Sequence, residues 1–576
     1  MSSIHSLVEN ELVEDDKSSV WVLKNHNGFD YSDGAGAETY LDRVLRSAKD
    51  LGSRSTELAS HVRDWTSEYH LSAKRGQLIS GFTFDRSLKV LEVGSGCGAI
   101  SRILGESFDR VVCIEGSLAR ARLAQLRTRD LASVSIICAP FHKIRFTEKF
   151  DVIFCIGVYE YSAAFVEAVD PYDEVLRRFA DALTPDGMVV IAIENQFGLK
   201  YFNGCREDHL GTHFEGIEGY HRRKAKVRTF GKVELEHRLK SYFQDVHFFY
   251  PYPDYKLPDC VLSAEFLAAE AAGELVSQMH SRDYAGLIRP FWDEAATVLE
   301  LARNNILEHF ANSFLVLAGR SGLKGVAFDQ LAILYSSGRT NKFTTQTQIV
   351  SRSDRWVVSK RSLQSTGAVD GGVVRLVNVE TPWLNTQSLD TQVMLRSRSD
   401  DLTLEEIFAP CRAWFDMLVA ISKTHDGDKY LDGAHVDSIW CNVYADQSGL
   451  KIIDREWLWH ADIPLNVIVI RAIYDFLLRL ERIPHIGAAL KFRSGRTLIR
   501  HIAIAIGANI QRHDFDAFIA LESELQAVVC GRDRLSQRAF SWWFLVDRTS
   551  LRQIRRFMKM AQSIIARVRA RLPRGT

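Results

Sequence analysis

The sequence predicts an α/β fold in its first half, with a parallel sheet and crossover helices, followed by an α+β unit and a C-terminal helix. Short apolar runs alternate with helical periods on either side of a glycine turn at 94–98. This alternation is typical of parallel strands joined by helices. The chain has 576 residues, which is too long for one hydrophobic core, so roughly two or three domains are expected.

The strands expected in the first half follow one another in chain order, with helices between them. The apolar runs that predict them lie at 89–93, 110–115, 133–139, 150–157 and 188–194, with later strands from DVHFFYPYP (245–253) and Val261–Leu262. The helical periods begin near residue 100 and cover 117–130 and 172–183. The turn TPDG (184–187) is expected to separate the last of these helices from the strand that follows.

A second globular unit is expected after residue 270. It opens with helical material, followed by strand-like patches at 312–318, 332–337, 345–350 and 355–360. From about residue 402 the pattern turns helical, with one loop-and-strand section at 432–454. A small β-rich lobe before a helical lobe is typical of kinase-like and aminoglycoside-phosphotransferase-like folds. The expected domains are therefore an N-terminal extension (1–60), an α/β domain (61–270), a kinase-like domain, active or inactive (271–530), and a basic C-terminal helix (531–576).

Composition excludes several classes of function. Lys and Arg together number 72, as do Asp and Glu, so no overall positive field favours nucleic acid. The nine cysteines form no CxxC pair, which argues against a zinc site or a disulfide framework and fits a reducing compartment. The acidic start of the chain has no signal-like apolar run, and no apolar stretch approaches 18 residues. We therefore expect a cytoplasmic protein.

The segment LRQIRRFMKMAQSIIARVRARLPRGT (551–576) carries only basic charges, and its apolar residues recur at helical spacing. Such a helix can lie on an anionic membrane surface, here the inner face of the cytoplasmic membrane. The alternative is a terminal helix that packs on its own domain and exposes its basic face to solvent.

The glycine turn LEVGSGCGA (91–99) fits two cofactors. The pattern GxGxxA at 94–99 is the dinucleotide fingerprint of dehydrogenases, and ExGxGxG at 92–98 is a loop that holds S-adenosylmethionine (SAM). Both require an acidic residue about 20 positions later to bind ribose hydroxyls, and Glu115 meets this need. The glycines alone leave the choice open.

The surrounding sequence favours SAM. Glu92 stands where its carboxylate can reach the amino-acid end of SAM, and Gly98 lets the backbone pass beside the nucleoside. FDVIFCIGVYEY (150–161) resembles the fourth strand of class I methyltransferases, and LTPDGMVVIAIEN (183–195) resembles their helix-turn-strand ending. The order and spacing of these features predict a Rossmann-like SAM-binding domain.

A closer resemblance extends from about Tyr31 to residue 265, to a group of bacterial SAM methyltransferases associated with glycosyltransferases and surface-polysaccharide assembly. The stretches that carry it are DWTSEYHLSAKRGQLI (64–79), LEVGSGCGAISRILGE (91–106), VYEYSAAF (158–165), AIENQFGLKYFNGCREDHLG (192–211), GIEGY (216–220) and FYPYPDYKLP (249–258). The resemblance implies methylation of a glycan such as the growing end of an O-antigen. It also implies glycosyltransferases as partners.

The residues expected around SAM come from the glycine turn, the two loops after it and a preceding helix. They are Glu92, Gly94, Ser95, Gly96, Gly98, Glu115, Gly116, Ser117, Phe141, Gly157, Tyr69 and His70. Many class I enzymes bind the adenine amine with an acidic residue after the third strand, and this chain has none in CAPFHKI (138–144), so Phe141 is expected to stack on the adenine.

The acceptor is expected at the loop after the strand at 188–194, because ligands of open α/β sheets bind at the carboxyl edge. His209 is the candidate base there, with Asp208 or Glu207 as its orienting carboxylate. The alternative is that the EDH sequence at 207–209 is a helix cap and surface turn. A sugar hydroxyl needs a base, whereas a phosphate acceptor does not.

A second motif lies in the other half of the chain. HVDSIWCN (435–442) has the spacing of the kinase catalytic loop HxDxxxxN, in which Asp437 would take the acceptor proton. Asn442 and Asp454 would hold Mg²⁺, and Lys360 would bind the phosphates of ATP. No metal site is certain from the sequence, and Mg²⁺ is expected at Asn442 and Asp454 only if the kinase-like domain is active.

The motif departs from protein kinases in three ways. No convincing glycine-rich loop precedes Lys360, no glutamate lies between Lys360 and Glu380, and REW rather than Phe-Gly follows Asp454. The alternative is a kinase-shaped domain that binds without transferring phosphate. The pair of domains nevertheless resembles bifunctional kinase–methyltransferases that terminate O-antigen chains.

The sequence therefore predicts a SAM-dependent methyltransferase that modifies a cell-surface polysaccharide or its lipid-linked precursor, at a sugar hydroxyl or a terminal phosphate. Two alternatives stay open, a small-molecule O- or C-methyltransferase and a non-catalytic scaffold for glycosyltransferases. Nucleic acid is not expected as a partner.

Overall fold

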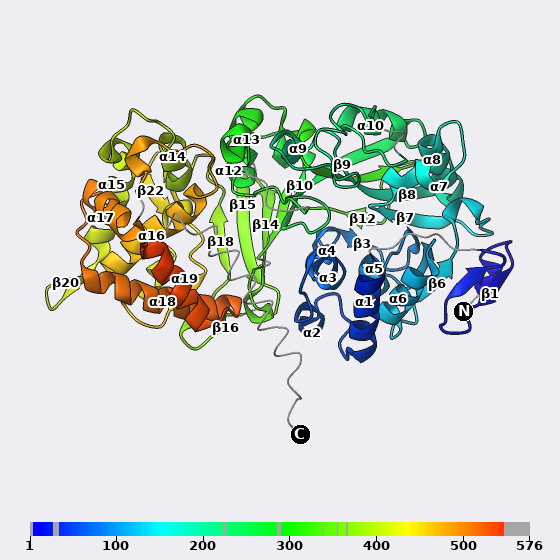
Figure 1. Cartoon of the computed structure of the whole chain (residues 1–576), viewed down its shortest axis with the longest axis horizontal. Coiled ribbons are helices and arrows are strands. Elements are labelled where there is room, and N and C mark those ends of the chain that lie inside the picture. Colours follow the sequence, from blue (N-terminus) through cyan, green and yellow to red (C-terminus); the bar gives the residue numbers. More distant parts are fainter. Residues whose placement is uncertain are drawn as a thin grey trace, which may run out of the picture. The chain divides into compact units, whose positions relative to one another are not determined.

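The structure, a computed structural model, describes residues 4–26, 34–222, 226–284, 290–336, 338–353, 355–364, 367–492 and 494–546. The chain divides into two compact units (Figure 1). Unit 1 comprises Met1–Arg289 and Val298–Leu334, and unit 2 comprises Pro290–Thr297 and Tyr335–Thr576.

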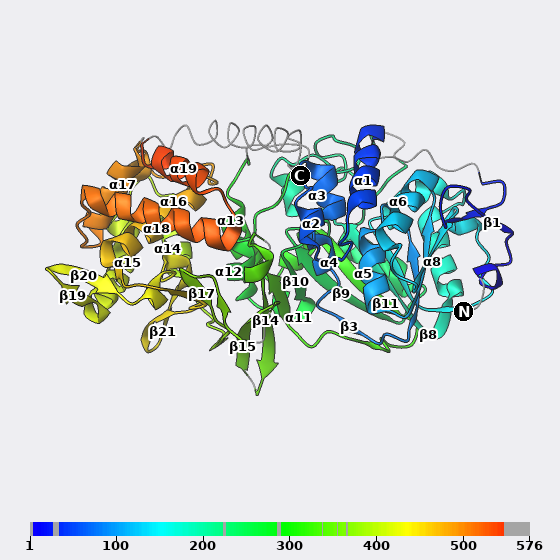
Figure 2. The same cartoon turned by 90° about the horizontal axis from the view of Figure 1, so that it is seen from below.

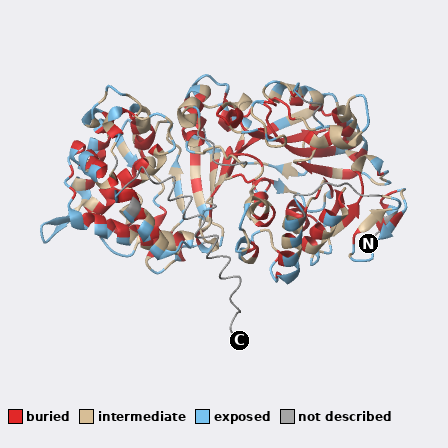
Figure 3. Ribbon diagram, in the orientation of Figure 1, coloured by how far each residue is buried: buried red, intermediate tan, exposed pale blue. Residues whose placement is uncertain are grey.

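One half of the unit 1 sheet is parallel, in the order β2-β6-β5-β4-β7-β8. These strands are β2 (Trp21–Leu23), β4 (Lys89–Val93), β5 (Arg110–Glu115), β6 (Val134–Cys138), β7 (Phe150–Ile156) and β8 (Leu183–Glu194). The central strands β4, β5 and β7 are almost wholly buried (Figure 3). Continuous apolar runs of this kind require cover on both faces of a sheet. The Rossmann-like α/β prediction for this region is confirmed.

Helices provide that cover. The helices on one face are α1 (Ala35–Ser47), α5 (Ala99–Ser107) and α6 (Leu118–Thr128), and those on the other are α8 (Pro171–Ala182) and α10 (Lys232–Lys240) (Figures 1 and 2). Helix α8 begins at Pro171, after Asp170, whose side chain accepts hydrogen bonds from two backbone N–H groups. Helices α5 and α6 begin shortly after β4 and β5, and the loops after these parallel strands lie at one edge of the sheet.

The N-terminal segment is part of this unit. Strands β1 (Leu12–Glu14) and β2 form an antiparallel hairpin, and β2 pairs in parallel with β6. Asp15, just after β1, pairs with Arg122 of α6 at 2.5 Å. The residues expected as an extension (1–60) therefore extend the sheet and cover α6.

The other half of the unit 1 sheet is antiparallel, in the order β8-β11-β9-β10-β13. Its additional strands are β9 (Asp245–Tyr252), β10 (Cys260–Ser263), β11 (Ser313–Gly319) and β13 (Ala332–Tyr335). Strand β11 lies between β8 and β9, where Leu315 is paired with Ala192 on one side and Phe249 on the other.

The expected boundary at residue 270 is therefore placed too early. The run at 312–318, expected in the second unit, is the buried strand β11 of unit 1. Unit 1 itself extends to Leu334. An apolar run indicates a buried strand but does not identify the strands with which it pairs, because strand pairing is non-local. The turn expected at 184–187 is also wrong, because these residues lie within β8, whose pairing with β7 shifts register between Phe150 and Val152.

Unit 2 has a small antiparallel sheet and a helical part. The sheet strands are β14 (Thr345–Arg352), β15 (Arg355–Ser362) and β18 (Val379–Pro382). The helices are α14 (Leu389–Arg396), α15 (Leu404–Ile421), α16 (Leu465–Leu480), α17 (Gly495–Ala505), α18 (Arg512–Cys530) and α19 (Arg534–Val546). A fully buried aromatic core is formed by Phe408 and Trp414 of α15, Phe476 of α16, and Trp440 of the 3-10 turn Trp440–Asn442.

Of the range expected to form the basic C-terminal helix (531–576), the structure describes α19 (Arg534–Val546), and residues 547–576 lie outside the described residues. Within the part of the chain that the structure describes, no helix is both long and apolar enough to span a membrane.

Substitution of Leu315 tests the central place of β11. Leu315 is fully buried, so Leu315→Ala should lower the free energy of opening of the β8 and β9 amides by roughly 2–5 kcal/mol. Native-state hydrogen exchange of the full chain measures this. The control Val233→Ala, at a residue that is 54% exposed on α10, should change the same amides by less than about 0.5 kcal/mol. Equal, small effects of both substitutions would contradict this placement.

Candidate active site

The glycine turn after β4 has a backbone that only glycine adopts easily. Gly94, Gly96 and Gly98 all have positive φ angles, of 82°, 55° and 85°. A Cβ atom on Gly94 would lie 2.4 Å from Val158 Cγ2, and one on Gly98 would lie 2.7 Å from Ala124 Cα. The turn therefore allows close approach of a ligand to the backbone and of α6 to α5.

Glu115, the last residue of β5, organises this turn. Its carboxylate accepts hydrogen bonds from the backbone N–H of Gly96 (2.7 Å) and of Ser117 (3.0 Å). It lines the same cavity as the turn. Glu115 therefore lies where the sequence places the acceptor of ribose hydroxyls.

A cavity of about 460 Å³ extends from the glycine turn toward the loops after β7 and β8. Ten of the residues expected around the cofactor line it, namely Glu92, Gly94, Ser95, Gly96, Glu115, Gly116, Phe141, Gly157, Tyr69 and His70. Gly98 and Ser117 do not. Gly98 packs against α6, and Ser117 is the residue before α6, so both shape the turn from behind.

Arg75 lines the cavity and was missed by the sequence analysis. It is buried in α4 (Lys74–Gln77), and its guanidinium donates hydrogen bonds to the carbonyl oxygens of Tyr255 (3.3 Å) and Lys256 (2.9 Å). Its Nε has no partner among the described residues. The neighbouring Lys74 pairs with Asp259 instead, and the sequence offered no means to tell which of the two basic residues faces the cavity.

Arg75 and Glu92 lie at the same end of the cavity. Glu92 is buried and accepts a hydrogen bond from Ser101 at 2.5 Å. Burial raises the pKa of Glu92 to about 7, and the charge of Arg75 opposes this rise. A guanidinium and a carboxylate at this place match the carboxylate and ammonium groups of an amino acid. Arg75 is therefore placed to bind the carboxylate of SAM.

The loops after β7 and β8 form the other end of the cavity. His209 Nδ1 lies 2.9 Å from Tyr161 Oη, and His209 Nε2 lies 3.3 Å from Glu194 Oε2. Glu160 and Glu194 are both fully buried. Glu160, Tyr161 and His209 line the cavity, as do Glu207 and Asp208.

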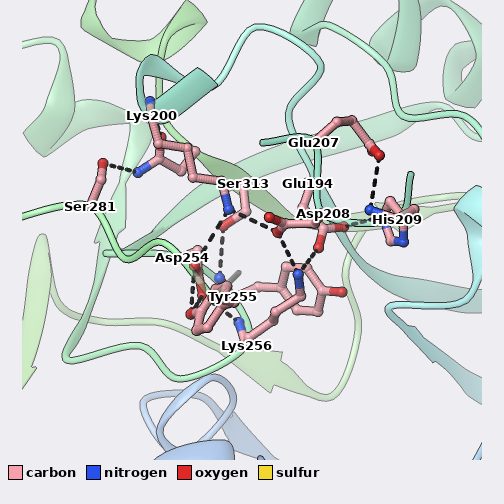
Figure 4. Close-up of polar contacts among 12 residues, drawn as sticks. Glu194, Lys200, Glu207, Asp208, His209, Asp254, Tyr255, Lys256, Ser281 and Ser313 are labelled. Atoms are coloured by element: carbon pink, nitrogen blue, oxygen red, sulfur yellow. Dashed lines mark hydrogen bonds and ion pairs between the residues drawn. The ribbon is translucent and has the colours of Figure 1, made fainter. Parts of the chain in front are cut away.

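The carboxylate beside the His209 ring is Glu194, so the expectation of Asp208 or Glu207 is corrected. Asp208 pairs instead with Lys200 (2.9 Å) and Lys256 (2.5 Å) (Figure 4). Glu207 accepts hydrogen bonds from the backbone N–H of His209 and of Leu210, which makes it a turn-forming residue. Glu194 lies beside the His209 ring because it is the last residue of β8, at the carboxyl edge of the sheet.

The buried charges shift one another's pKa values. Burial alone would lower the pKa of His209, but the charge and hydrogen bond of Glu194 raise it to about 9. Burial would raise the pKa of Glu194, but Lys256 and His209 hold it well below its usual range. Burial, and next the charge of Glu194, raise the pKa of Glu160 to about 8. The charge of Glu194 therefore favours the protonated form of His209 when no other cation is bound beside it.

Unit 2 brings together the residues of its own motif in two pairs. Lys360 Nζ of β15 lies 2.5 Å from Asp454, and the Asn442 side-chain amide donates to Asp437 at 3.1 Å. Three residues that the sequence did not single out complete the cluster, with ion pairs Lys360–Glu456 (3.0 Å), Arg339–Glu456 (2.5 Å) and Arg471–Asp437 (2.6 Å). The partner missing between Lys360 and Glu380 is thus Glu456, two positions after Asp454.

Comparison with known proteins identifies the first unit. Residues 91–191 match a family described as "Methyltransferase domain", and no curated protein matches the sequence. Solved structures with a similarity to part of this chain include the N-methyltransferase NodS of Bradyrhizobium japonicum WM9 with S-adenosylhomocysteine (SAH), at 20% identity and a TM-score of 0.19 over 28% of this chain and 74% of that one. Another is Haemonchus contortus phosphoethanolamine N-methyltransferase 1 with phosphoethanolamine and SAH, at 12% identity and a TM-score of 0.27 over 50% of this chain and 49% of that one.

The family match covers the glycine turn, Glu115 and strands β4 to β8 up to residue 191. The protein is therefore a SAM-dependent methyltransferase, and SAM is its cofactor. Overlaps of this extent with the solved structures say nothing about the methyl acceptor.

Binding of cofactor fragments tests the role of Arg75. Arg75→Met should raise the Kd for SAH by roughly tenfold or more, because a charge-assisted hydrogen bond contributes about 1.5–3 kcal/mol. Its effect on decarboxylated SAH should be less than about twofold, because that ligand lacks the group that Arg75 binds. Calorimetry measures both values. Arg86→Met, at an exposed arginine, is the matched control and should leave both unchanged. An equal loss for both ligands would mean that Arg75 only supports the loop at 255–256.

Proposed function

We propose that the protein transfers the methyl group of SAM to a hydroxyl group of a cell-surface polysaccharide or of its lipid-linked precursor. The observation that supports a hydroxyl acceptor is the buried, acidic end of the cavity, formed by Glu160, Glu194 and His209. The glycan itself is supported by the sequence resemblance over about residues 31–265.

The charges at this end of the cavity favour a neutral acceptor over an anionic one. Glu160 is fully buried and has no cationic side chain paired with it among the described residues. Lys256, whose charge acts on Glu160, is already paired with Glu194 and Asp208 at 2.5 Å each. A phosphate placed here would add negative charge beside the buried Glu194 and Glu160, in a desolvated site whose lysine is already paired, which is unfavourable.

A hydroxyl, by contrast, needs what this end of the cavity provides. When bound, SAM supplies an activated methyl group, and the enzyme must align the acceptor with it and receive the acceptor's proton. Glu160 has two carboxylate oxygens without partners, whereas His209 is engaged by Tyr161 and Glu194. We therefore assign proton acceptance to Glu160 in place of His209. Arg75, Glu92 and Glu115 hold the cofactor at the other end.

The decisive experiment is transfer of label from methyl-tritiated SAM to the purified lipid-linked glycan, with and without ATP and Mg²⁺. We expect transfer without ATP, and a labelled methyl ether that resists phosphatase and phosphodiesterase. Glu160→Gln should lower the turnover rate by roughly 100-fold or more, as expected for loss of a proton acceptor, with little change in the Kd for SAH. Glu167→Gln, at an exposed glutamate in the same loop, is the control. Label that requires ATP and is released as methyl phosphate would overturn the hydroxyl assignment.

A second activity, phosphate transfer from ATP by unit 2, is supported by the convergence of its motif residues. Lys360 of β15 pairs with Asp454, which is distant in sequence, and Asp437 is hydrogen-bonded to Asn442 within the motif at 435–442. Under this proposal Asp437 takes the acceptor proton, Lys360 binds phosphate, and Asn442 and Asp454 hold Mg²⁺.

Transfer of phosphate from γ-labelled ATP to the same glycan tests this second activity. Asp437→Asn should reduce transfer by roughly 1,000-fold, as expected for loss of an essential proton acceptor and positioning group. Asp416→Asn, at an exposed aspartate of α15, should leave transfer unchanged. Absence of Mg²⁺-dependent label in the unaltered protein, with the glycan still methylated, would leave unit 2 without phosphotransferase activity.

A further inference from the structure

Three potential metal ligands converge at the acceptor end of the methyl-transfer cavity. Glu160, Glu194 and His209 each offer one ligand atom, and these atoms all lie within 4.8 Å of one another. The three residues come from the 3-10 turn Tyr159–Tyr161 after β7, from the end of β8 and from the loop that follows α9 (Leu199–Phe202). Ligands around one divalent ion are separated by such distances, because metal–ligand bonds are about 2.0–2.2 Å.

We propose that Glu160, Glu194 and His209 bind a divalent transition-metal cation, of the Mn²⁺ or Zn²⁺ type, with an open coordination position that faces the cavity. Two carboxylate oxygens and one imidazole nitrogen suit such ions, whereas Mg²⁺ and Ca²⁺ favour sites made of oxygen alone. Sites with three protein ligands and an open position are typical of metal ions that act on a bound oxygen.

The independent observation is the state of Glu160. Its side chain is fully buried, and neither carboxylate oxygen has a hydrogen-bond partner among the residues that the structure describes. A buried carboxylate without a partner is strongly unfavourable. Glu160 lines the cavity beside Tyr161 and His209, so a cation held there would satisfy it.

The lysines near Glu160 are paired with other carboxylates. Lys200 pairs with Asp208 at 2.9 Å and lies 3.8 Å from Asp254, and Lys256 pairs with Glu194 Oε1 and Asp208. The two buried lysines thus lie within ion-pair distance of three carboxylates, and among the described residues neither lysine is paired with Glu160. A divalent ion that bridges Glu160 and the other oxygen of Glu194 supplies the missing charge without displacing Lys256.

The partner of His209 suits a metal-binding role. A ligating histidine usually presents one ring nitrogen to the metal and donates its other N–H to a fixed acceptor. His209 Nε2 faces Glu194, and its Nδ1 lies 2.9 Å from Tyr161 Oη. Tyr161 would therefore fix the orientation and tautomer of the ring.

The open position gives the ion a function in methyl transfer, and this step rests on the hydroxyl acceptor proposed above. An acceptor hydroxyl bound there becomes more acidic, because the cation stabilises the oxygen as it loses its proton. The oxygen of Glu160 that does not bind the metal takes that proton, the acceptor oxygen bonds to the methyl carbon, and the sulfur–carbon bond breaks to give SAH.

Metal binding by the full-length protein tests the site directly. After treatment with EDTA and removal of the chelator, Mn²⁺ binding is followed by electron paramagnetic resonance and Zn²⁺ binding by calorimetry. Because unit 2 offers its own carboxylates, Asp454→Asn is measured in parallel as the matched control. Glu160→Gln and His209→Asn should each weaken metal binding at the unit 1 site by roughly 100-fold or more, because each removes a ligand. Asp454→Asn, in unit 2, should leave metal binding at the unit 1 site unchanged. Tyr161→Phe should weaken it by about tenfold.

The shift in Tm on addition of SAH should persist in the Glu160→Gln and His209→Asn variants, which shows that unit 1 is folded. Equal stoichiometry and affinity in the unaltered protein and in both variants would overturn the metal site. Failure of the metal site and failure of the proposed function are distinguishable. Hydroxyl methylation by a protein that binds no metal rejects the site alone, and metal binding at Glu160 without any hydroxyl methylation rejects the acceptor alone.

Discussion

The burial of Glu194 at the carboxyl end of β8 is the constraint on which the acceptor end of the cavity depends. A carboxylate removed from water is very unfavourable unless a counter-charge accompanies it. Lys256 and His209 provide that charge at 2.5 and 3.3 Å. Because Lys256 precedes β10 and His209 follows β8, this one carboxylate holds two distant loops against the sheet edge. Asp208 and Lys200 extend the same network, so the loops are fixed by paired charges in a dry environment.

The cofactor end is held by a different means, namely backbone geometry. The positive φ angles of the glycine turn and the contact of Gly98 with α6 leave little freedom, and Glu115 ties the turn down through two backbone N–H groups. Gly157 shows how the two ends meet, since a Cβ atom there would lie 2.5 Å from Tyr255 Oη. Tyr255 precedes Lys256, so the residue that limits the space beside the cofactor is adjacent to the lysine that balances Glu194.

This difference explains how much could be predicted from the sequence. The glycine turn, Glu115 and the strands around them follow from local patterns, because glycine spacing, apolar runs and the acid about 20 residues later all lie along one βαβ segment. The partner of His209 could not be found in this way. Asp208 and Glu207 are its neighbours in sequence, but Asp208 is taken by Lys200 and Lys256, and only the packed loops show that Glu194 faces the ring. The run at 312–318 was predicted as a strand but placed in the wrong unit, and the role of Arg75 was missed, because both positions depend on contacts that are distant in sequence.

The pairing of charges distinguishes the polar cluster at the acceptor end of the unit 1 cavity from the cluster around Lys360 in unit 2. In the unit 2 cluster, three cations accompany three carboxylates, with Arg471 beside Asp437, Lys360 beside Asp454 and Arg339 beside Glu456. That cluster is balanced as it stands, so a metal ion there would have to take Asp454 from Lys360. Phosphate groups of a nucleotide could bring this about, because they would draw Lys360 to themselves and release the carboxylate. In unit 1, neither carboxyl oxygen of Glu160 has a hydrogen-bond partner among the described residues. Cation binding in unit 2 is therefore expected to follow nucleotide, whereas the site proposed at Glu160, Glu194 and His209 is expected to bind a cation without nucleotide.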